Sequence, residues 1–326
     1  MGYPVASLSV CFRVVSRPSA CPPVRPPAIV IDTDPGIDDA VTLALAARSP
    51  ELEVVAVIAT YGNAALAETT RNARAALARA GRPDIRVHAG GARPLSRPPV
   101  TGAAMHGPSG IGHAAVTPAP AVTPDPSALF RILSAATAPV TLLTLGPLTD
   151  LAHALEEDAA MVARAVGRHI AMLGAFAERG APDRLADFNA WADPDAAHRV
   201  LHAGLRTQLI PLDVARRMTT HARDVARLAA SPDGLTQWLA AALQFSVEAH
   251  RAVRGVDGCA LNDVLTLGEV LAPGLLGFEE RQITVDLDEG ERRGHTREAA
   301  DGVLMPVATS ADVARMRSLL GRVFKA

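Results

Sequence analysis

The sequence predicts a single α/β domain with a mostly parallel, Rossmann-like central sheet that is covered by helices on both faces. Three observations support this prediction. Short β-branched runs, such as residues 28–33 and 52–60, alternate with alanine- and leucine-rich segments of helical spacing. Hydrophobic residues in these runs are continuous rather than alternating, which indicates strands that are buried on both faces. With 326 residues, of which 49% are hydrophobic and 20% charged, the chain is long enough for one such domain.

The expected elements follow one another along the chain. Helices are expected over 38–49 and 67–81, and a last helix over 310–324 with Ser310 as its N-cap. Residues 221–271 have helical spacing without an intervening strand and are predicted to form a helical insertion. The remaining strands are expected at 85–90, 140–145, 169–173, 206–214, 281–288 and 302–309.

The first 27 residues differ from the rest of the chain. They contain arginines but no acidic residue, and prolines in their second half disfavour helices and central strands. We interpret 1–27 as a disordered extension or a misassigned start, and 28–326 as the domain. A targeting peptide is the less favoured alternative, because the segment lacks a basic start before its apolar part. Three cysteines without metal-type spacing suit a reducing cytoplasm.

Charge and composition indicate a small-molecule partner. A formal net charge of -2 provides no basic field for nucleic acid or an anionic membrane, and no apolar run is long enough to span a bilayer. Residues 92–126 contain eight prolines and several glycines, too many for regular structure. Long loops of this kind are often lids, so we predict a movable flap.

The stretch IVIDTDPGIDDA, residues 29–40, places Asp32, Asp34, Asp38 and Asp39 around one turn. Ligands of open α/β sheets bind beyond the carboxyl ends of strands, which is where this turn is expected. A helix dipole explains acids at the helix start, but not Asp32 and Asp34 at the strand end. Because close carboxylates repel one another, the turn predicts a bound cation, and its oxygen ligands favour Ca²⁺ or Mg²⁺.

A phosphatase of the haloacid dehalogenase type is one alternative, because those Mg²⁺ enzymes also present aspartates at a strand end. They generally need a lysine or an arginine to balance a phosphoaspartate. The single lysine of this chain is Lys325, the residue just before the last one given, Ala326. Asp-Pro-Gly also replaces the hydroxyl and apolar residues expected after the second aspartate, so this alternative is less favoured.

Residues 29–40 resemble the signature of the inosine-uridine-preferring nucleoside hydrolases, calcium-dependent enzymes that cleave the N-glycosidic bond of ribonucleosides. The resemblance extends from residue 28 to about residue 310 and implies release of free base and ribose by a homodimer or homotetramer. Further segments that agree, in the same order, are IATYGN, ETTRNA, HGPSGIG, TLGPLTDLA, AMLGAF, ADFNAWADPDAA, PLDV and LNDVLTL.

The resemblance also implies roles for individual residues. Asp34 is expected both to bind Ca²⁺ and to accept a proton from the attacking water, while Asp32 supports the turn. The other implied calcium ligands are Asp39, Asp263 and the carbonyl of Leu145. The implied substrate contacts are Asp38, Asn63, Met172, Asp187, Asn189 and Asn262.

The chain departs from the family pattern at three of these positions. Asp187 replaces a glutamate and Ala181 an asparagine, and both positions normally contact the 5′-hydroxyl. Asn262 replaces a histidine that acts near the leaving base. We therefore expect either that His106, in the 92–126 loop, protonates the leaving base, or that the preferred base leaves without a proton.

Two further hypotheses follow from the same departures. Arg179 and Arg184 flank Ala181 and are candidates for binding a 5′-phosphate. A catalytically weak nucleoside- or ribose-binding protein of the same fold is the alternative function. The full set of expected carboxylates, Asp34 included, favours the enzyme.

Overall fold

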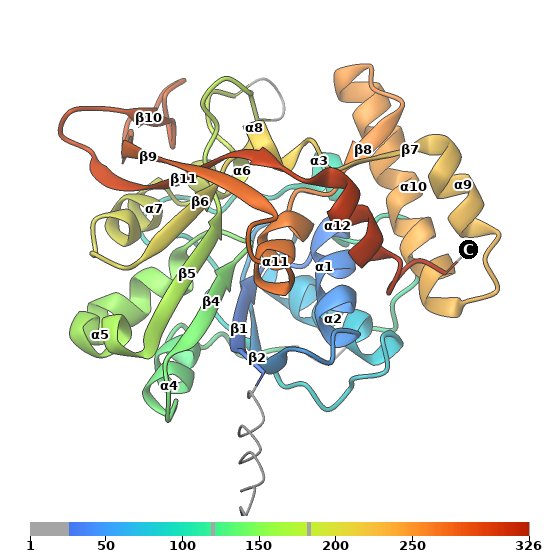
Figure 1. Cartoon of the computed structure of the whole chain (residues 1–326), viewed down its shortest axis with the longest axis horizontal. Coiled ribbons are helices and arrows are strands. Elements are labelled where there is room, and N and C mark those ends of the chain that lie inside the picture. Colours follow the sequence, from blue (N-terminus) through green and yellow to red (C-terminus); the bar gives the residue numbers. More distant parts are fainter. Residues whose placement is uncertain (1–25, 119–120, 181–183, 326) are drawn as a thin grey trace, which may run out of the picture.

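The computed structural model describes residues 26–118, 121–180 and 184–325. These residues form a nine-stranded sheet between two layers of helices, which confirms the predicted α/β class (Figure 1). In sheet order the strands are β3 (Val87–Ala89), β2 (Glu53–Ala59), β1 (Ala28–Thr33), β4 (Val140–Thr144), β5 (Val166–Met172), β6 (Thr207–Ile210), β11 (Val303–Ala311), β9 (Leu276–Val285) and β10 (Thr296–Glu298). Neighbouring strands are parallel from β3 to β11, and β9 and β10 complete the sheet in antiparallel pairs.

Successive side chains of the central strands point to opposite helix layers. Ile29 and Ile31 of β1 belong to one hydrophobic core and Val30 to the other, as the alternation of side chains along a strand requires. The first core includes α1 (Ile37–Ala47), α2 (Leu66–Arg79), α10 (Gly234–Arg254), α11 (Val264–Leu271) and α12 (Val313–Leu320). The second includes α4 (Ala128–Ser134), α5 (Thr149–Ala165) and α7 (Pro194–Leu201).

The carboxyl ends of β2, β1 and β4 meet at one edge of the sheet. Asp32 is in register with Ile58 of β2 and Thr144 of β4. Just beyond the strands, the N–H of Leu145 donates to the carbonyl of Asp32 at 2.8 Å. The loops that follow the three strands therefore converge on the start of α1, where ligands of such sheets bind.

The predicted helical insertion contains a strand. Helices α9 (Ala222–Ala229) and α10 are separated from α11 by β8 (Gly258–Ala260), which pairs antiparallel with β7 (Thr219–His221). The prediction of helices without a strand was wrong, because a three-residue strand shows no periodicity.

The N-cap predicted at Ser310 was also wrong. Ser310 belongs to β11, and the side chain of Asp312 caps α12 by accepting a hydrogen bond from the N–H of Arg315 at 3.0 Å. Serine and aspartate cap helices about equally well, so residue type alone could not distinguish the two positions.

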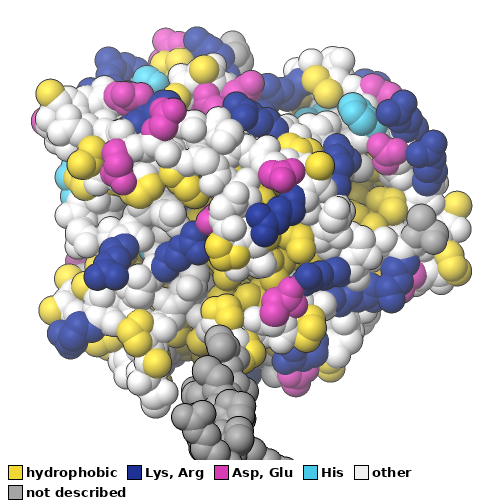
Figure 2. Space-filling model, viewed as in Figure 1, with side chains coloured by type: hydrophobic (Ala, Val, Ile, Leu, Met, Phe, Trp, Pro, Cys, Tyr) yellow, Lys and Arg dark blue, Asp and Glu magenta, His cyan; other side chains and the backbone are white. Residues whose placement is uncertain are grey.

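Part of the long loop after β3 is regular. It contains the short helix α3 (Ala103–His106), and Asn72 of α2 donates to the carbonyl of Ser109 at 2.8 Å. Movement of this loop stays a prediction, as does the interpretation of residues 1–27, of which 1–25 lie outside the described part. No helix of the described residues is long and apolar enough to cross a membrane. Figure 2 shows basic and acidic side chains interspersed on the face in view.

Candidate active site

The acidic turn joins β1 to α1 and places its aspartates at the helix start. Asp38 and Asp39 lie in the first turn of α1, where the helix dipole favours negative charge. Asp39 accepts hydrogen bonds from the N–H of Gly36 at 2.9 Å and from the hydroxyl of Thr33. The side chain of Asn63, which follows β2, donates to the same carboxylate at 3.1 Å. Backbone and side-chain donors together hold Asp39 in one orientation.

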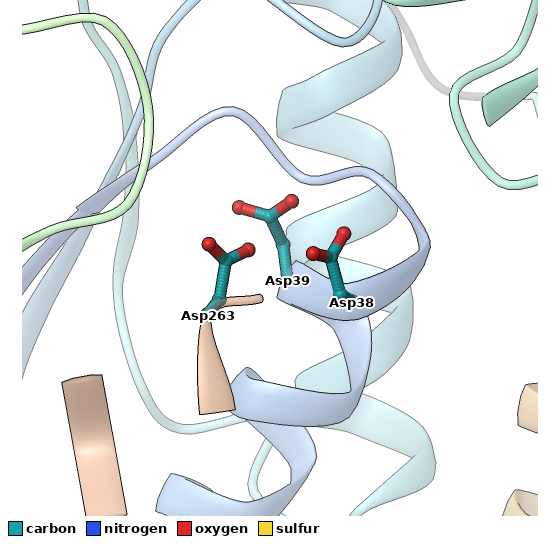
Figure 3. Close-up of side chains that lie close together, drawn as sticks. All are labelled: Asp38, Asp39 and Asp263. Carbon is teal, nitrogen blue, oxygen red and sulfur yellow. The ribbon is translucent and has the colours of Figure 1, made fainter. Parts of the chain in front are cut away.

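A third carboxylate, far away in the sequence, joins Asp38 and Asp39. Asp263 is the N-cap residue of α11, but its side chain makes no capping hydrogen bond. It turns toward the other two carboxylates instead (Figure 3), and the three groups offer oxygens that all lie within 4.8 Å of one another. All three residues are buried. An oxygen-only group of this size can hold a divalent cation.

Asp34 lies beside this group, at the end of β1. It is 1% exposed, and its Oδ2 accepts the N–H of Asn63 at 2.7 Å. Its Oδ1 has no hydrogen-bond donor among the described residues. A Cβ added at Gly146, the residue after Leu145, would lie 2.9 Å from this Oδ1, which places the oxygen against the loop after β4. A buried, unsatisfied oxygen is costly unless a proton or a cation reaches it.

The charges of this cluster shift its pKa values upward. Burial raises the pKa of Asp34 well above its usual range, and Asp39 and Asp38 raise it further. Burial raises the pKa of Asp263 well above its usual range, and Asp38 and Asp39 raise it further. Burial and then Asp38 raise the pKa of Asp39 to about 6. No cationic side chain is among the largest effects on the pKa values of Asp34, Asp38 and Asp263. The cluster therefore lacks positive charge of its own.

Asp32 lies next to a different carboxyl group. Both oxygens of Asp32 lack a donor among the described residues, and burial followed by Asp150 raises its pKa. Asp150, at the start of α5, accepts the N–H of Gly91 at 2.8 Å. The backbone carbonyl of Asp32 accepts the N–H of Leu145, and the supporting role of the Asp32 side chain stays a prediction.

The carbonyl of Leu145 is held by one amide side chain. Nδ2 of Asn189, in α6 (Phe188–Ala192), donates to the carbonyl of Leu145 at 2.7 Å and to that of Met172 at 2.9 Å. A carbonyl oxygen has two lone pairs, so that of Leu145 can still bind a cation. Asn189 thus connects the ends of β4 and β5.

A cavity opens above the carboxylates, and its walls come from elements distant in the sequence. Asp38, Asn63 and Asn262 line it beside α3, and the N–H of Asn262 donates to Asp38 Oδ2 at 3.1 Å. The other lining residues include Gly180, Arg184 and Phe188, and also Arg216, Ser246, His250 and Arg254.

His106 of α3 also lines the cavity and is fixed to the acidic turn. Its Nδ1 accepts the N–H of Ile37 at 3.1 Å, so the neutral ring carries its proton on Nε2. Burial lowers the pKa of His106 to about 4, although Asp39 opposes the shift. At neutral pH the ring is therefore an uncharged donor.

Comparison with known proteins identifies this arrangement. Residues 29–318 match the family model described as inosine-uridine preferring nucleoside hydrolase. The chain belongs to this family. Members of the family are metal-dependent hydrolases, and the aspartate cluster is the group of described residues that can hold a metal ion.

Named relatives and solved structures agree with the family assignment. The chain is 36% identical over 252 residues to the pyrimidine-specific ribonucleoside hydrolase RihA of Photobacterium profundum, covering 76% of this chain and 80% of the relative. It is 33% identical to RihA of Salmonella agona, covering 82% and 87%. A plant nucleoside hydrolase superimposes with a TM-score of 0.83 at 29% identity, covering 92% of this chain and all of the plant chain. A purine-preferring ribonucleoside hydrolase from Gardnerella vaginalis gives 0.82 at 25%, covering 91% and 98%.

Two residues expected to contact substrate have other partners in this nucleoside hydrolase. Asp187 is fully buried and caps α6: its oxygens accept the N–H groups of Gly174, Asn189 and Ala190 at 2.8–3.1 Å. Met172 is 5% exposed, and its backbone carbonyl holds Asn189. Neither residue lines the cavity, so their contact with substrate stays a prediction.

Of the two arginines proposed to bind a 5′-phosphate, one lines the cavity and the other does not. Arg184 lines the cavity and stacks on Trp191, with 3.6 Å from the guanidinium carbon to the ring centroid, whereas Arg179 is not among the lining residues. Ala181 lies outside the described residues. Sequence reasoning missed Arg216, His250 and Arg254. The four-residue spacing of His250 and Arg254, which places both on one face of α10, was a usable signal.

Proposed function

We propose that the chain hydrolyses the N-glycosidic bond of a ribonucleoside, or of a modified ribosyl compound, to free base and ribose with Ca²⁺ as cofactor. The observation that carries this proposal is the buried cluster of Asp38, Asp39 and Asp263, of which Asp38 lines the cavity, and on which no lysine or arginine is among the largest effects on the pKa values. Such a carboxylate cluster stabilises both a bound cation and the positive charge that develops on the ribose.

The donor set fits Ca²⁺. Carboxylates of Asp34, Asp39 and Asp263 and the carbonyl of Leu145 would hold the ion, because Ca²⁺ accepts six to eight oxygen ligands in flexible geometry. The unsatisfied Oδ1 of Asp34 agrees with this assignment. When bound, the cation supplies positive charge that orients the ribose hydroxyls and acidifies the attacking water.

The carboxylate of Asp34 would also accept the proton of that water. In the metal-free protein, burial and the neighbouring carboxylates raise the pKa of Asp34. As the base departs, positive charge develops on the ribose, and the carboxylates of Asp38 and Asp39 stabilise it electrostatically. Asp38, Asn63 and Asn189 are the proposed contacts of the sugar hydroxyls; Asp38 and Asn63 line the cavity, whereas Asn189 does not.

His106 assists the leaving base as a hydrogen-bond donor. Because its Nδ1 accepts the N–H of Ile37, its Nε2–H is the group available to the cavity. This donor and the side chain of Asn262 take the place of the histidine that relatives carry at position 262. From the cysteine usage we also propose a cytoplasmic location, and from the family resemblance alone a homodimer or homotetramer.

The test is a reducing-sugar assay with a panel of ribonucleosides, run with and without a calcium chelator. We expect ribose release that the chelator abolishes and added Ca²⁺ restores. Asp34→Asn should lose at least about a hundredfold in turnover, since it removes the proton acceptor. Asp224→Asn is the matched control, because Asp224 pairs with Arg227 on the surface of α9 and does not line the cavity. Tight nucleoside binding without release would instead support a binding protein.

A further inference from the structure

The end of the cavity formed by α8 (Leu212–Ala215), α10 and β8 carries two guanidinium groups. Arg216 directly follows α8 and Arg254 ends α10, and both line the cavity. Their side chains are 17% and 28% exposed, so both are partly withdrawn from solvent. His250 lines the same wall one helical turn before Arg254.

One carboxylate serves both arginines. Glu178 pairs with Arg216 and lies 3.6 Å from Arg254, but it does not line this cavity. Together with the arginines it lines a neighbouring hollow, so it stands behind them. A second acid, Asp213, acts on Arg216, but its oxygens accept the backbone N–H groups of residues 176–178 at 2.7–3.1 Å. Among the described residues that line the cavity, Asp38 is the one acid, and it belongs to the carboxylate cluster, so the cavity-facing side of the two guanidinium groups presents positive charge.

The surroundings of His250 show the same excess of positive charge. Burial lowers the pKa of His250, and Arg254, His106 and Arg216 lower it further, against the hydrogen bond from its Nδ1 to the Ser246 carbonyl at 2.8 Å. Arg254 likewise lowers the pKa of Arg216 after burial. Guanidinium groups in such a setting bind carboxylates strongly and in a fixed orientation.

This end of the cavity lies on the side where the leaving group is expected. Asn262 and His106, the proposed donors to the leaving base, line the same cavity as His250, and His106 lowers the pKa of His250. The sugar hydroxyls are expected at the carboxylate cluster. Arg184 also lines the cavity, but its guanidinium group is stacked on Trp191, so it forms no part of the pair described here.

We propose that Arg216 and Arg254 form an anion-binding subsite for the leaving group. The preferred substrate is then a riboside whose base carries a negatively charged group, such as a carboxylate. This inference rests on the proposed function for the direction in which the substrate lies. Glu178 sets the positions of the two guanidinium groups, and the anion of the substrate becomes their second counter-ion.

The first test compares kcat/KM for uridine and 5-carboxyuridine, which differ by one carboxylate on the base. We expect a ratio that favours the carboxylated substrate and falls about tenfold in Arg254→Gln and in Arg216→Gln. Glu178→Gln should raise the ratio, because it leaves the guanidinium pair without its acidic partner. Arg251→Gln is the matched control on α10: Arg251 pairs with Asp257 and does not line the cavity. A ratio in both cavity variants within twofold of the control would overturn the proposal.

A second test distinguishes an anion on the base from an anion at the 5′ position of the substrate. It does not depend on turnover. Calorimetry of the calcium-free protein should show uracil-5-carboxylate binding more tightly than uracil, with the difference lost in Arg254→Gln. Uridine 5′-monophosphate should be insensitive to Arg254→Gln, and sensitivity confined to it would place the anion at the 5′ position and refute the leaving-group assignment. If no riboside is hydrolysed, the proposed function fails, while the base-binding comparison still decides the subsite.

Discussion

A methyl group added at Gly62 should disable the site through a direct collision with Asp34. A Cβ at this position would lie 2.0 Å from Asp34 Oδ2, whereas ordinary contact begins near 3.4 Å. In Gly62→Ala the carboxylate must therefore move by about 1 Å or more, and a displacement of that size can cost about a hundredfold in rate. The packing strain should also cost about 1–3 kcal/mol of stability.

The assay measures kcat/KM with the best nucleoside of the panel at saturating calcium, together with thermal unfolding. Gly81→Ala is the matched control. Gly62 and Gly81 both have positive φ, 154° and 91°, but a Cβ at Gly81 has nothing within 4 Å. The control should lose some stability and keep its activity. A folded Gly62→Ala protein with activity within threefold of the wild type would refute the assignment of Asp34.

Three further perturbations test other parts of the site. His106→Ala should lower kcat far more than it raises KM, because the ring donates to the leaving base; His113→Ala, in the same loop and paired with the exposed Glu248, should not. Asn189→Leu should weaken calcium binding by about tenfold, measured by calorimetry, because it frees the carbonyl of Leu145 from its amide. In the calcium-free protein, the pKa of Asp39 is raised to about 6, so the folded state binds more protons than the unfolded state between about pH 4 and pH 6. The free energy of unfolding therefore falls as pH rises through that window, by on the order of 3 kcal/mol from Asp39 alone. This fall should be absent in Asp39→Asn. A pH profile of unfolding identical to that of the wild type would contradict the assignment.

Much of the fold was predictable because its signals are local. The strands around β1 are short, apolar runs, and β-branched residues buried on both faces leave little ambiguity. The strand β8 was missed because three residues carry no period. The cap of α12 was misplaced because Ser310 and Asp312 are equally suitable cap residues.

The site was predictable where one motif holds the chemistry. Asp34, Asp38 and Asp39 share a single turn, so their proximity follows from the sequence. The meeting of Asp263 with Asp38 depends on how α11 packs against α1, which was reached only through the family resemblance.

The arginine pair was beyond sequence reasoning for the same physical reason. Arg216 and Arg254 are 38 positions apart and meet through Glu178, a contact that only the packing of the elements around α8 and α10 creates. The capping role of Asp187 was also hidden, because an aspartate before an aromatic residue gives no sign of the backbone groups that it accepts.

Calcium dependence of ribose release is the most direct test of the central claim, that buried carboxylates hold a cation for nucleoside hydrolysis. The protein is stripped with a chelator, and ribose release is then followed as Ca²⁺ is titrated back while bound calcium is measured in parallel. The proposed mechanism predicts no release from the stripped protein and a rise in activity that is complete when one ion is bound per chain. Full ribose release by the metal-free protein would contradict it.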